Sequence, residues 1–61
     1  MRDPNRIYKF CNELAAIWAK VPDWRFGQLI SNISGSYDKD IFFPEDDEFL
    51  QFMKDYIEKV T

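Results

Sequence analysis

Histidine is absent from the 61-residue chain, and cysteine occurs once, at Cys11. The missing imidazole removes the commonest general base, the commonest zinc ligand and every catalytic triad that uses histidine. A single cysteine forms no intramolecular disulfide, and without a histidine partner we interpret Cys11 as an inert hydrophobic residue of the core. A chain of this length also has little room for a water-excluding pocket. We therefore predict a protein that is not an enzyme and has no catalytic residues, metal ion or cofactor.

Long hydrophobic runs and an excess of basic residues are missing as well. A secretory signal needs roughly seven or more consecutive apolar residues, and a transmembrane helix needs about twenty. The sequence has neither, so we expect a cytoplasmic protein with no membrane partner. Lysine and arginine together number 8 against 11 acidic residues, which gives a net charge of −3. The basic residues are scattered singly, whereas phosphate binding needs them clustered, so a nucleic-acid partner is unlikely on this composition.

Hydrophobic residues at helical spacing indicate the fold. A first helix is predicted over residues 4–20, with Asp3 as its N-cap and an end imposed by the Val21-Pro22 pair. A short second helix is predicted to begin at an Asp23 cap and to carry the i, i+3, i+4, i+7 apolar pattern as far as Ile33.

The third helix is predicted from Glu45 to Glu58 or beyond, with an acidic first turn that suits the helix dipole. Residues 34–40 are rich in turn formers, and residues 41–43 are expected to pack on the core as an extended segment. Residues 1–61 then form one domain of the all-α class, a compact three-helix domain with an extended linker between helices 2 and 3. The predicted core consists of the inward-facing apolar residues Ile7, Phe10, Leu14, Trp18, Phe26, Leu29, Ile30, Phe49, Met53, Tyr56 and Ile57.

Two helices have more apolar surface than one core contact uses. The apolar stripe of the third helix covers about 160° of its circumference, where about 100° suffices for a core contact. The first helix has a second face with Tyr8, Ala15 and Ala19, which we interpret either as a contact face or as ordinary alanine helix propensity. Because so short a chain is marginally stable alone, we expect a homodimer that uses the surplus width of the first and last helices.

Exposed aromatic and charged residues are the candidates for partner binding. Tryptophan and arginine are enriched in interface hot spots, so Trp24 and Arg25 either form such a site or anchor the turn after Pro22. The acidic run at 45–48 either imitates the phosphates of DNA or is a favourable helix start on a solvated face. The candidate partner-binding residues are Trp24, Arg25, Tyr8, Asp46, Asp47 and Phe42.

Three stretches also carry a resemblance to a family. These are Met1-Arg2-Asp3-Pro4-Asn5-Arg6-Ile7, the central Pro22-Asp23-Trp24-Arg25-Phe26-Gly27-Gln28-Leu29-Ile30, and Phe42-Phe43 before Glu45-Asp46-Asp47-Glu48. Together they resemble a family of very short proteins of Firmicutes bacteria, their phages and their mobile elements. The resemblance carries over no catalytic residue. It implies an expectation of context, in which phage proteins of this size act as stoichiometric inhibitors of a bacterial antiviral defence complex.

Three functions follow as alternatives. The first is a non-enzymatic, self-associating protein-binding module, encoded by a phage or prophage and directed at a host defence complex. The second is a housekeeping interaction or adaptor protein of the bacterial cytoplasm. The third is an acidic mimic of nucleic acid, which a net charge of only −3 disfavours, or a DNA-associated regulator, which the scattered basic residues disfavour.

Overall fold

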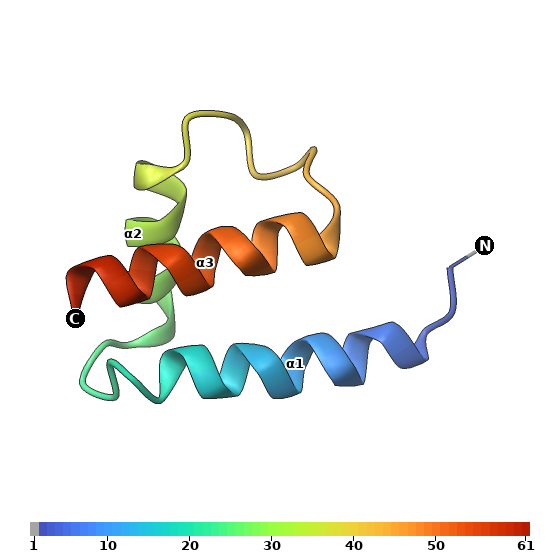
Figure 1. Ribbon diagram of the computed structural model, residues 1–61, viewed down its shortest axis with the longest axis horizontal. Helices are drawn as coiled ribbons and strands as arrows, with labels where there is room; N and C mark the ends of the chain where they lie inside the picture. Colours follow the sequence, from blue (N-terminus) through green and yellow to red (C-terminus); the bar gives the residue numbers. More distant parts are fainter. Residues whose placement is uncertain (1) are drawn as a thin grey trace.

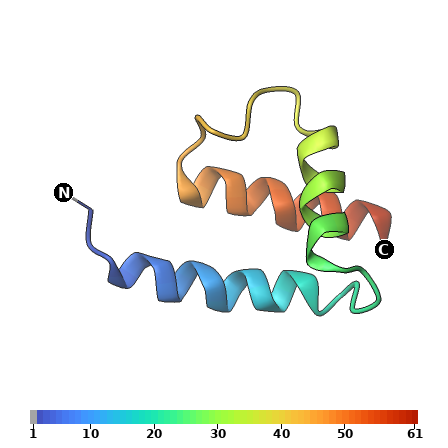
Figure 2. The same cartoon turned by 180° about the vertical axis from the view of Figure 1, so that it is seen from behind.

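The computed structural model describes residues 2–61, which form three helices: α1 (Asn5–Trp18), α2 (Phe26–Ser36) and α3 (Asp46–Val60). Helices α1 and α3 lie side by side and run in the same direction, while α2 crosses α3 on one side, near the C-terminal end of α3 (Figure 1, Figure 2). The connection between α2 and α3 passes along the side of α3 that faces away from α1 (Figure 1). This arrangement confirms the predicted all-α, three-helix domain with an extended linker between the second and third helices.

All three helices contribute to the core. Its buried members are Ile17, Leu29, Ile33, Leu50, Met53 and Ile57. Three of these were predicted, and five further predicted residues are half-buried and pack against the cluster: Phe10, Leu14, Trp18, Phe49 and Tyr56. The periodicity of the sequence therefore identified most of the inward-facing stripe of each helix.

Other core assignments were wrong. Ile7 and Phe26 are 48% and 49% exposed, and Ile30 is only half-buried, whereas Ile17 and Ile33 are buried and were not predicted. Helix α1 meets α3 along the side that carries Ile17, so Ile7, which lies on a different part of the apolar stripe, remains in contact with water.

Helix α1 is slightly shorter than predicted. The carboxylate of Asp3 accepts the backbone N–H of Asn5 at 2.9 Å, so Asp3 does receive an N-terminal donor, although Pro4 occupies the capping position. At the other end, the N–H of Lys20 donates to the carbonyl of Ile17 at 3.2 Å. This tighter i to i−3 bond turns the chain away from the helix before it reaches the proline that was expected to end it.

Helix α2 begins later and ends later than predicted. Gln28, and not Asp23, supplies its first side-chain cap, because the side-chain oxygen of Gln28 accepts the backbone N–H of Arg25 at 2.8 Å. The helix continues through Ser36, across residues expected to form a polar connection. The extra turn places the ring of Tyr37 against Phe49 and Phe52 of α3, so packing overrides the weak helix propensity of this segment.

Gly27 in α2 is a position at which alanine should make the folded protein more stable. A Cβ built at Gly27 meets nothing within 4 Å, and the glycine does not have a positive φ, so no close approach requires it. We expect Gly27→Ala to raise the free energy of unfolding by about 0.5–1 kcal/mol, because alanine loses less backbone entropy in a helix. Urea denaturation followed by circular dichroism tests this, and a lower midpoint than that of the wild type would contradict it.

Ion pairs fasten the N-terminal segment and α1 to α3. Within residues 2–61, Arg2 pairs with Glu45 at 2.8 Å and Arg6 pairs with Asp46, both at the start of α3. Because α1 and α3 are parallel, the start of α3, where acids are favourable, lies beside the basic start of the chain. All of these side chains are partly exposed, so the pairs fix the register of the two helices more than they add stability.

Candidate protein-binding surfaces

The predicted partner-binding residues do not form one surface. Helix α1 and the connection between α2 and α3 lie on opposite sides of α3 (Figure 1). Tyr8 is on α1, Phe42 is on the connection, Trp24 and Arg25 precede α2, and Asp46 and Asp47 are in the first turn of α3. Each position therefore has to be judged by its own surroundings.

Trp24 is held in the fold by its surroundings. Its side chain is half-buried against the core, and its backbone carbonyl accepts the indole N–H of Trp18 at 2.8 Å. The neighbouring Arg25 is exposed. These contacts favour the interpretation of Trp24 as an anchor of the turn between α1 and α2 over its interpretation as an interface hot spot.

The acidic run at the start of α3 is largely engaged within the chain. Glu45 and Asp46 are paired with arginines, and the carboxylate of Asp47 accepts the backbone N–H of Glu48 at 2.9 Å. A mimic of DNA needs unpaired negative charges spread over a surface that a basic groove can reach. The geometry favours the alternative interpretation, a favourable helix start with acidic residues in the first turn.

Residues Ile41, Phe42 and Phe43, which we call the aromatic tip, are exposed, and the prediction that they pack on the core was wrong. Phe42 and Phe43 are 81% and 75% exposed, and Ile41 is 36% exposed. Asp40 holds this turn: its carboxylate accepts the N–H of Phe42 at 2.9 Å, and its carbonyl accepts the N–H of Phe43 at 3.3 Å. The two phenylalanine rings meet edge to face, with their centroids 5.0 Å apart.

Tyr37 explains why the aromatic tip cannot reach the core. Its ring centroid lies 5.6 Å from that of Phe49 and 4.8 Å from that of Phe52, both in edge-to-face geometry. Tyr37 thus covers part of the apolar stripe of α3, and the expected packing of residues 41–43 on the core does not occur. The surplus apolar width predicted for the last helix is largely used within the chain.

The aromatic tip lies in the most acidic part of the sequence. Residues 37–48 contain six acidic residues and one lysine, a net charge of −5, so the rest of the chain carries +2 within the total of −3. Of the unpaired acids, Asp38 and Asp40 directly precede the tip. A surface of this kind is complementary to an apolar pocket with a basic rim.

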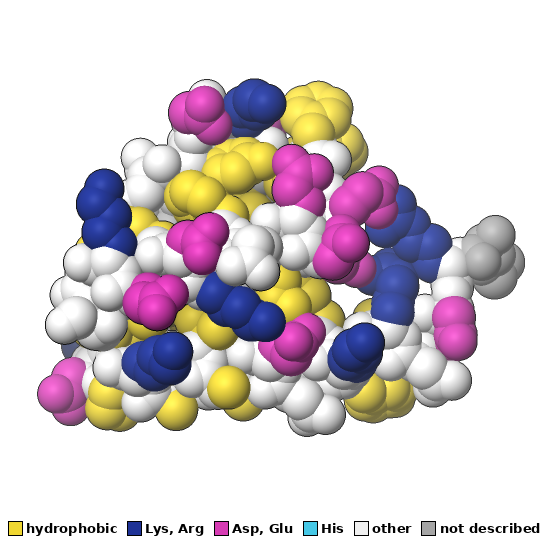
Figure 3. Space-filling view, viewed as in Figure 1, with side chains coloured by type: hydrophobic (Ala, Val, Ile, Leu, Met, Phe, Trp, Pro, Cys, Tyr) yellow, Lys and Arg dark blue, Asp and Glu magenta, His cyan; other side chains and the backbone are white. Residues whose placement is uncertain are grey.

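A second apolar surface runs along α1. Tyr8 is 71% exposed, and Cys11, Ala15 and Ala19 are exposed on the same side of the helix; we call these four residues the outer face of α1. The prediction that Cys11 is buried was wrong, because α3 covers a different side of α1, the one that carries Ile17. In Figure 3, separate hydrophobic side chains are visible along the lower edge of the molecule, over α1, and others are visible at the top, over the connection between α2 and α3.

The outer face ends in a shallow hollow. Ala15, Trp18, Ala19 and Pro22 line this hollow, which has a volume of about 260 Å³. Phe26 borders Trp18, with 5.5 Å between the ring centroids, and is itself half exposed. The small side chains of the two alanines leave this space, and the aromatic ring of Trp18 forms one of its walls.

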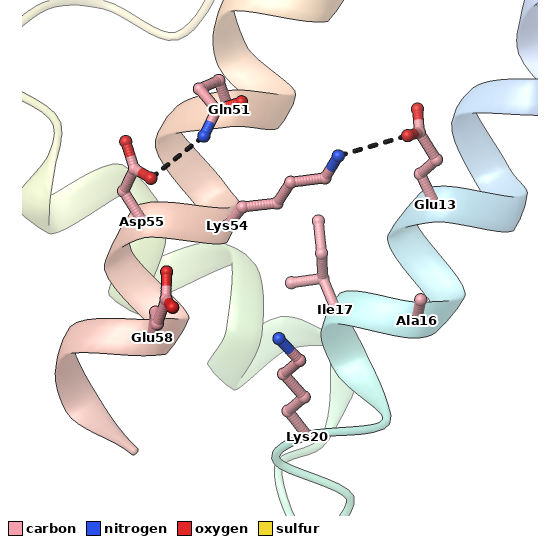
Figure 4. A pocket seen from close by; sticks show the side chains of 8 residues that line it. All are labelled: Glu13, Ala16, Ile17, Lys20, Gln51, Lys54, Asp55 and Glu58. Carbon is pink, nitrogen blue, oxygen red and sulfur yellow. Dashed lines mark hydrogen bonds and ion pairs between the residues drawn. The ribbon is translucent and has the colours of Figure 1, made fainter.

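A groove of about 320 Å³ separates α1 from α3 on the side opposite α2. Figure 4 shows Lys54 reaching across it to Glu13, at 3.2 Å, above the side chain of Ile17. Its other charged residues are Lys20, Asp55 and Glu58, so charges of both signs alternate along it. This lining makes the groove a solvated seam over the core rather than a pocket for an apolar ligand.

Neither a metal site nor a membrane span is found in residues 2–61. No group of three or more metal-ligating side chains gathers in the described part of the chain. Within the same residues, no helix combines the length and the hydrophobicity that crossing a bilayer requires.

Comparison of the chain with models of protein families, with curated proteins and with solved structures finds no match. The resemblance to short Firmicutes and phage proteins therefore stays a prediction, and functional inference has to start from the two exposed apolar surfaces.

Proposed function

We propose that the chain is a non-enzymatic protein-binding module that inserts its aromatic tip into an apolar pocket of a partner protein. One observation carries this proposal: Phe42 and Phe43 are 81% and 75% exposed on a turn whose geometry is fixed by Asp40. Exposed apolar groups of this kind mark sites of protein interaction. Aromatic rings supply most of the contact energy in such sites.

The charges beside the tip define the chemistry of the partner. Arg2 and Arg6 pair with Glu45 and Asp46, so the other four acids and Lys39 leave a net charge of −3 over residues 37–48, which attracts the module to a pocket whose rim carries lysine or arginine. This attraction raises the association rate and selects the orientation, while the two rings supply the affinity. The resemblance implies that the partner with this pocket belongs to an antiviral defence complex. The alternative partner is a housekeeping assembly.

Affinity capture from a Firmicutes lysate tests the role of the tip. We expect Phe42→Ser with Phe43→Ser to weaken capture of the partner at least about thirtyfold, since each hot-spot aromatic contributes about 2 kcal/mol or more. Both rings are largely in water, so the variant should keep the circular-dichroism spectrum of the wild type. Val60→Ser is the matched control, because Val60 is 47% exposed at the end of α3, away from the tip.

The control variants separate the alternatives. Full capture by the tip variant would contradict the proposal. Loss of capture with Asp47→Asn and Glu48→Gln, but not with the tip variant, would instead support acidic mimicry of nucleic acid. A partner that is a nuclease or helicase of a defence system would support the antagonist, and a metabolic or ribosomal partner would support the adaptor.

A further inference from the structure

The outer face of α1 is free of charge. The charged residues of this helix, Arg6, Lys9 and Glu13, all lie on the half of its circumference towards the groove. A helix that faces water normally carries charged residues on its exposed side. The opposite half of α1 has none, although Tyr8 and Cys11 are exposed there.

The total surface of the chain is larger than expected for its mass. A folded monomer of 7.4 kDa exposes about 4,200 Å² by the usual scaling. This chain exposes 4823 Å². The excess is about 600 Å², and the aromatic tip and the outer face of α1 both contribute exposed apolar area to it.

The outer face has a large exposed side chain, the knob, near one end and a hollow near the other. Tyr8 projects near one end, and the hollow over Ala15, Trp18, Ala19 and Pro22 lies near the other, about ten residues or roughly 15 Å along the axis. The hollow is shallow and open, so it offers a tyrosine ring a surface to lie against, formed by Ala15, Ala19 and the ring of Trp18. Two copies with their α1 helices antiparallel would bring each Tyr8 to the hollow of the other copy.

We propose that a second copy of this chain binds the outer face of α1, with the two α1 helices antiparallel about a two-fold axis. Such an isologous contact uses the same patch twice, which suits a surface with its own knob and hollow. The antiparallel direction opposes the two helix dipoles, and the uncharged face brings no like charges together. Cys11 of one copy then lies beside Ala15 of the other.

This dimer uses one helix, where the sequence had suggested two. Tyr37 packs on Phe49 and Phe52 of α3, and the charged residues Asp55 and Lys59 border the remaining open apolar residues of that helix, whereas the outer face of α1 has no charged residue. The proposal is independent of the aromatic tip, which lies on the opposite side of α3 and stays free in the dimer (Figure 1).

Sedimentation equilibrium of purified Ala15→Arg and Ala16→Arg tests the proposal. Both alanines are exposed on the same helix, and arginine has nearly the helix propensity of alanine, so both variants should stay folded. We expect the wild type and Ala16→Arg to sediment at twice 7.4 kDa, and Ala15→Arg at 7.4 kDa. Tyr8→Ala should raise the dissociation constant at least about tenfold, as loss of a hot-spot tyrosine does.

Alkylation of Cys11 with a maleimide gives a second measurement that needs no substitution. The rate constant for alkylation of Cys11 should fall as the concentration of wild-type protein rises, because the dimer covers Cys11. In Ala15→Arg the same rate constant should not depend on protein concentration. A wild-type mass of 7.4 kDa at every concentration would overturn the proposal. The proposal would also be overturned if Ala16→Arg dissociated the dimer as much as Ala15→Arg does. An alkylation rate of Cys11 in the wild type that does not depend on protein concentration would overturn it as well.

Discussion

Ile33→Ala is expected to lower the free energy of unfolding by about 2–5 kcal/mol, the usual cost of truncating a buried isoleucine to alanine. Ile33 is 0% exposed, and it is one of the six buried hydrophobic residues among residues 2–61. A domain of this length has a total stability of about 3–9 kcal/mol, so this one substitution should remove between about a quarter of the stability and all of it. Urea denaturation followed by far-ultraviolet circular dichroism measures the loss.

Ile41→Ala provides the control for this experiment. It removes the same atoms from a side chain that is 36% exposed in the connection, so its cost should be under about 1 kcal/mol. Both variants should be compared at one protein concentration, because self-association would make stability depend on concentration. Equal losses in the two variants would mean that Ile33 is not part of a packed core.

Trp18 is expected to be the other sensitive position. It packs against the core, its ring lies 5.5 Å from that of Phe26, and its indole N–H donates to the carbonyl of Trp24 at 2.8 Å. Trp18→Ala should cost about 3–5 kcal/mol, because it removes both the packing and the bond. Trp18→Phe keeps much of the ring and should cost about 1–3 kcal/mol, since the carbonyl of Trp24 loses its donor. Thermal unfolding ranks the two variants.

Trp24→Phe tests how much of the cost of Trp18→Phe comes from the lost hydrogen bond between the two tryptophans and how much comes from the smaller ring. The acceptor is a backbone carbonyl, so this variant keeps the bond while it reduces the half-buried ring to a similar degree. We expect it to be less destabilising than Trp18→Phe. The opposite order would show that the bond between the two tryptophans contributes little and that ring size alone determines stability.

The bounds of α1 and α3 could be predicted closely because their signals are local. The apolar repeat of α3 and its acidic first turn fixed the start of that helix to within one residue of the observed Asp46. For α1, Asp3 and Pro4 did the same. Caps, dipole effects and side-chain periodicity act within a few residues, so they can be read from the sequence before any neighbour is known.

The partners of each helix could not be predicted in the same way. A wide apolar stripe does not say which part of it meets another element, so Cys11 and Ile7 were placed in the core although both are exposed. The competition between Tyr37 and the aromatic tip for α3 is decided by packing between segments. Both candidate binding surfaces are left exposed by this packing between segments. Phe42 was therefore identified as a candidate from the sequence, although its surroundings were predicted incorrectly.

The parallel pairing of α1 with α3 also determines when this protein can fold during synthesis. Helix α3 supplies Leu50, Met53 and Ile57, half of the buried core, and it follows α1 and α2 in the chain. Residues up to 45 therefore have little to collapse on, and α1 meets α3 only after the intervening loop and α2 are closed between them, at an entropic cost. A nascent chain that ends before α3 would leave the apolar sides of α1 and α2 open to chaperones and proteases.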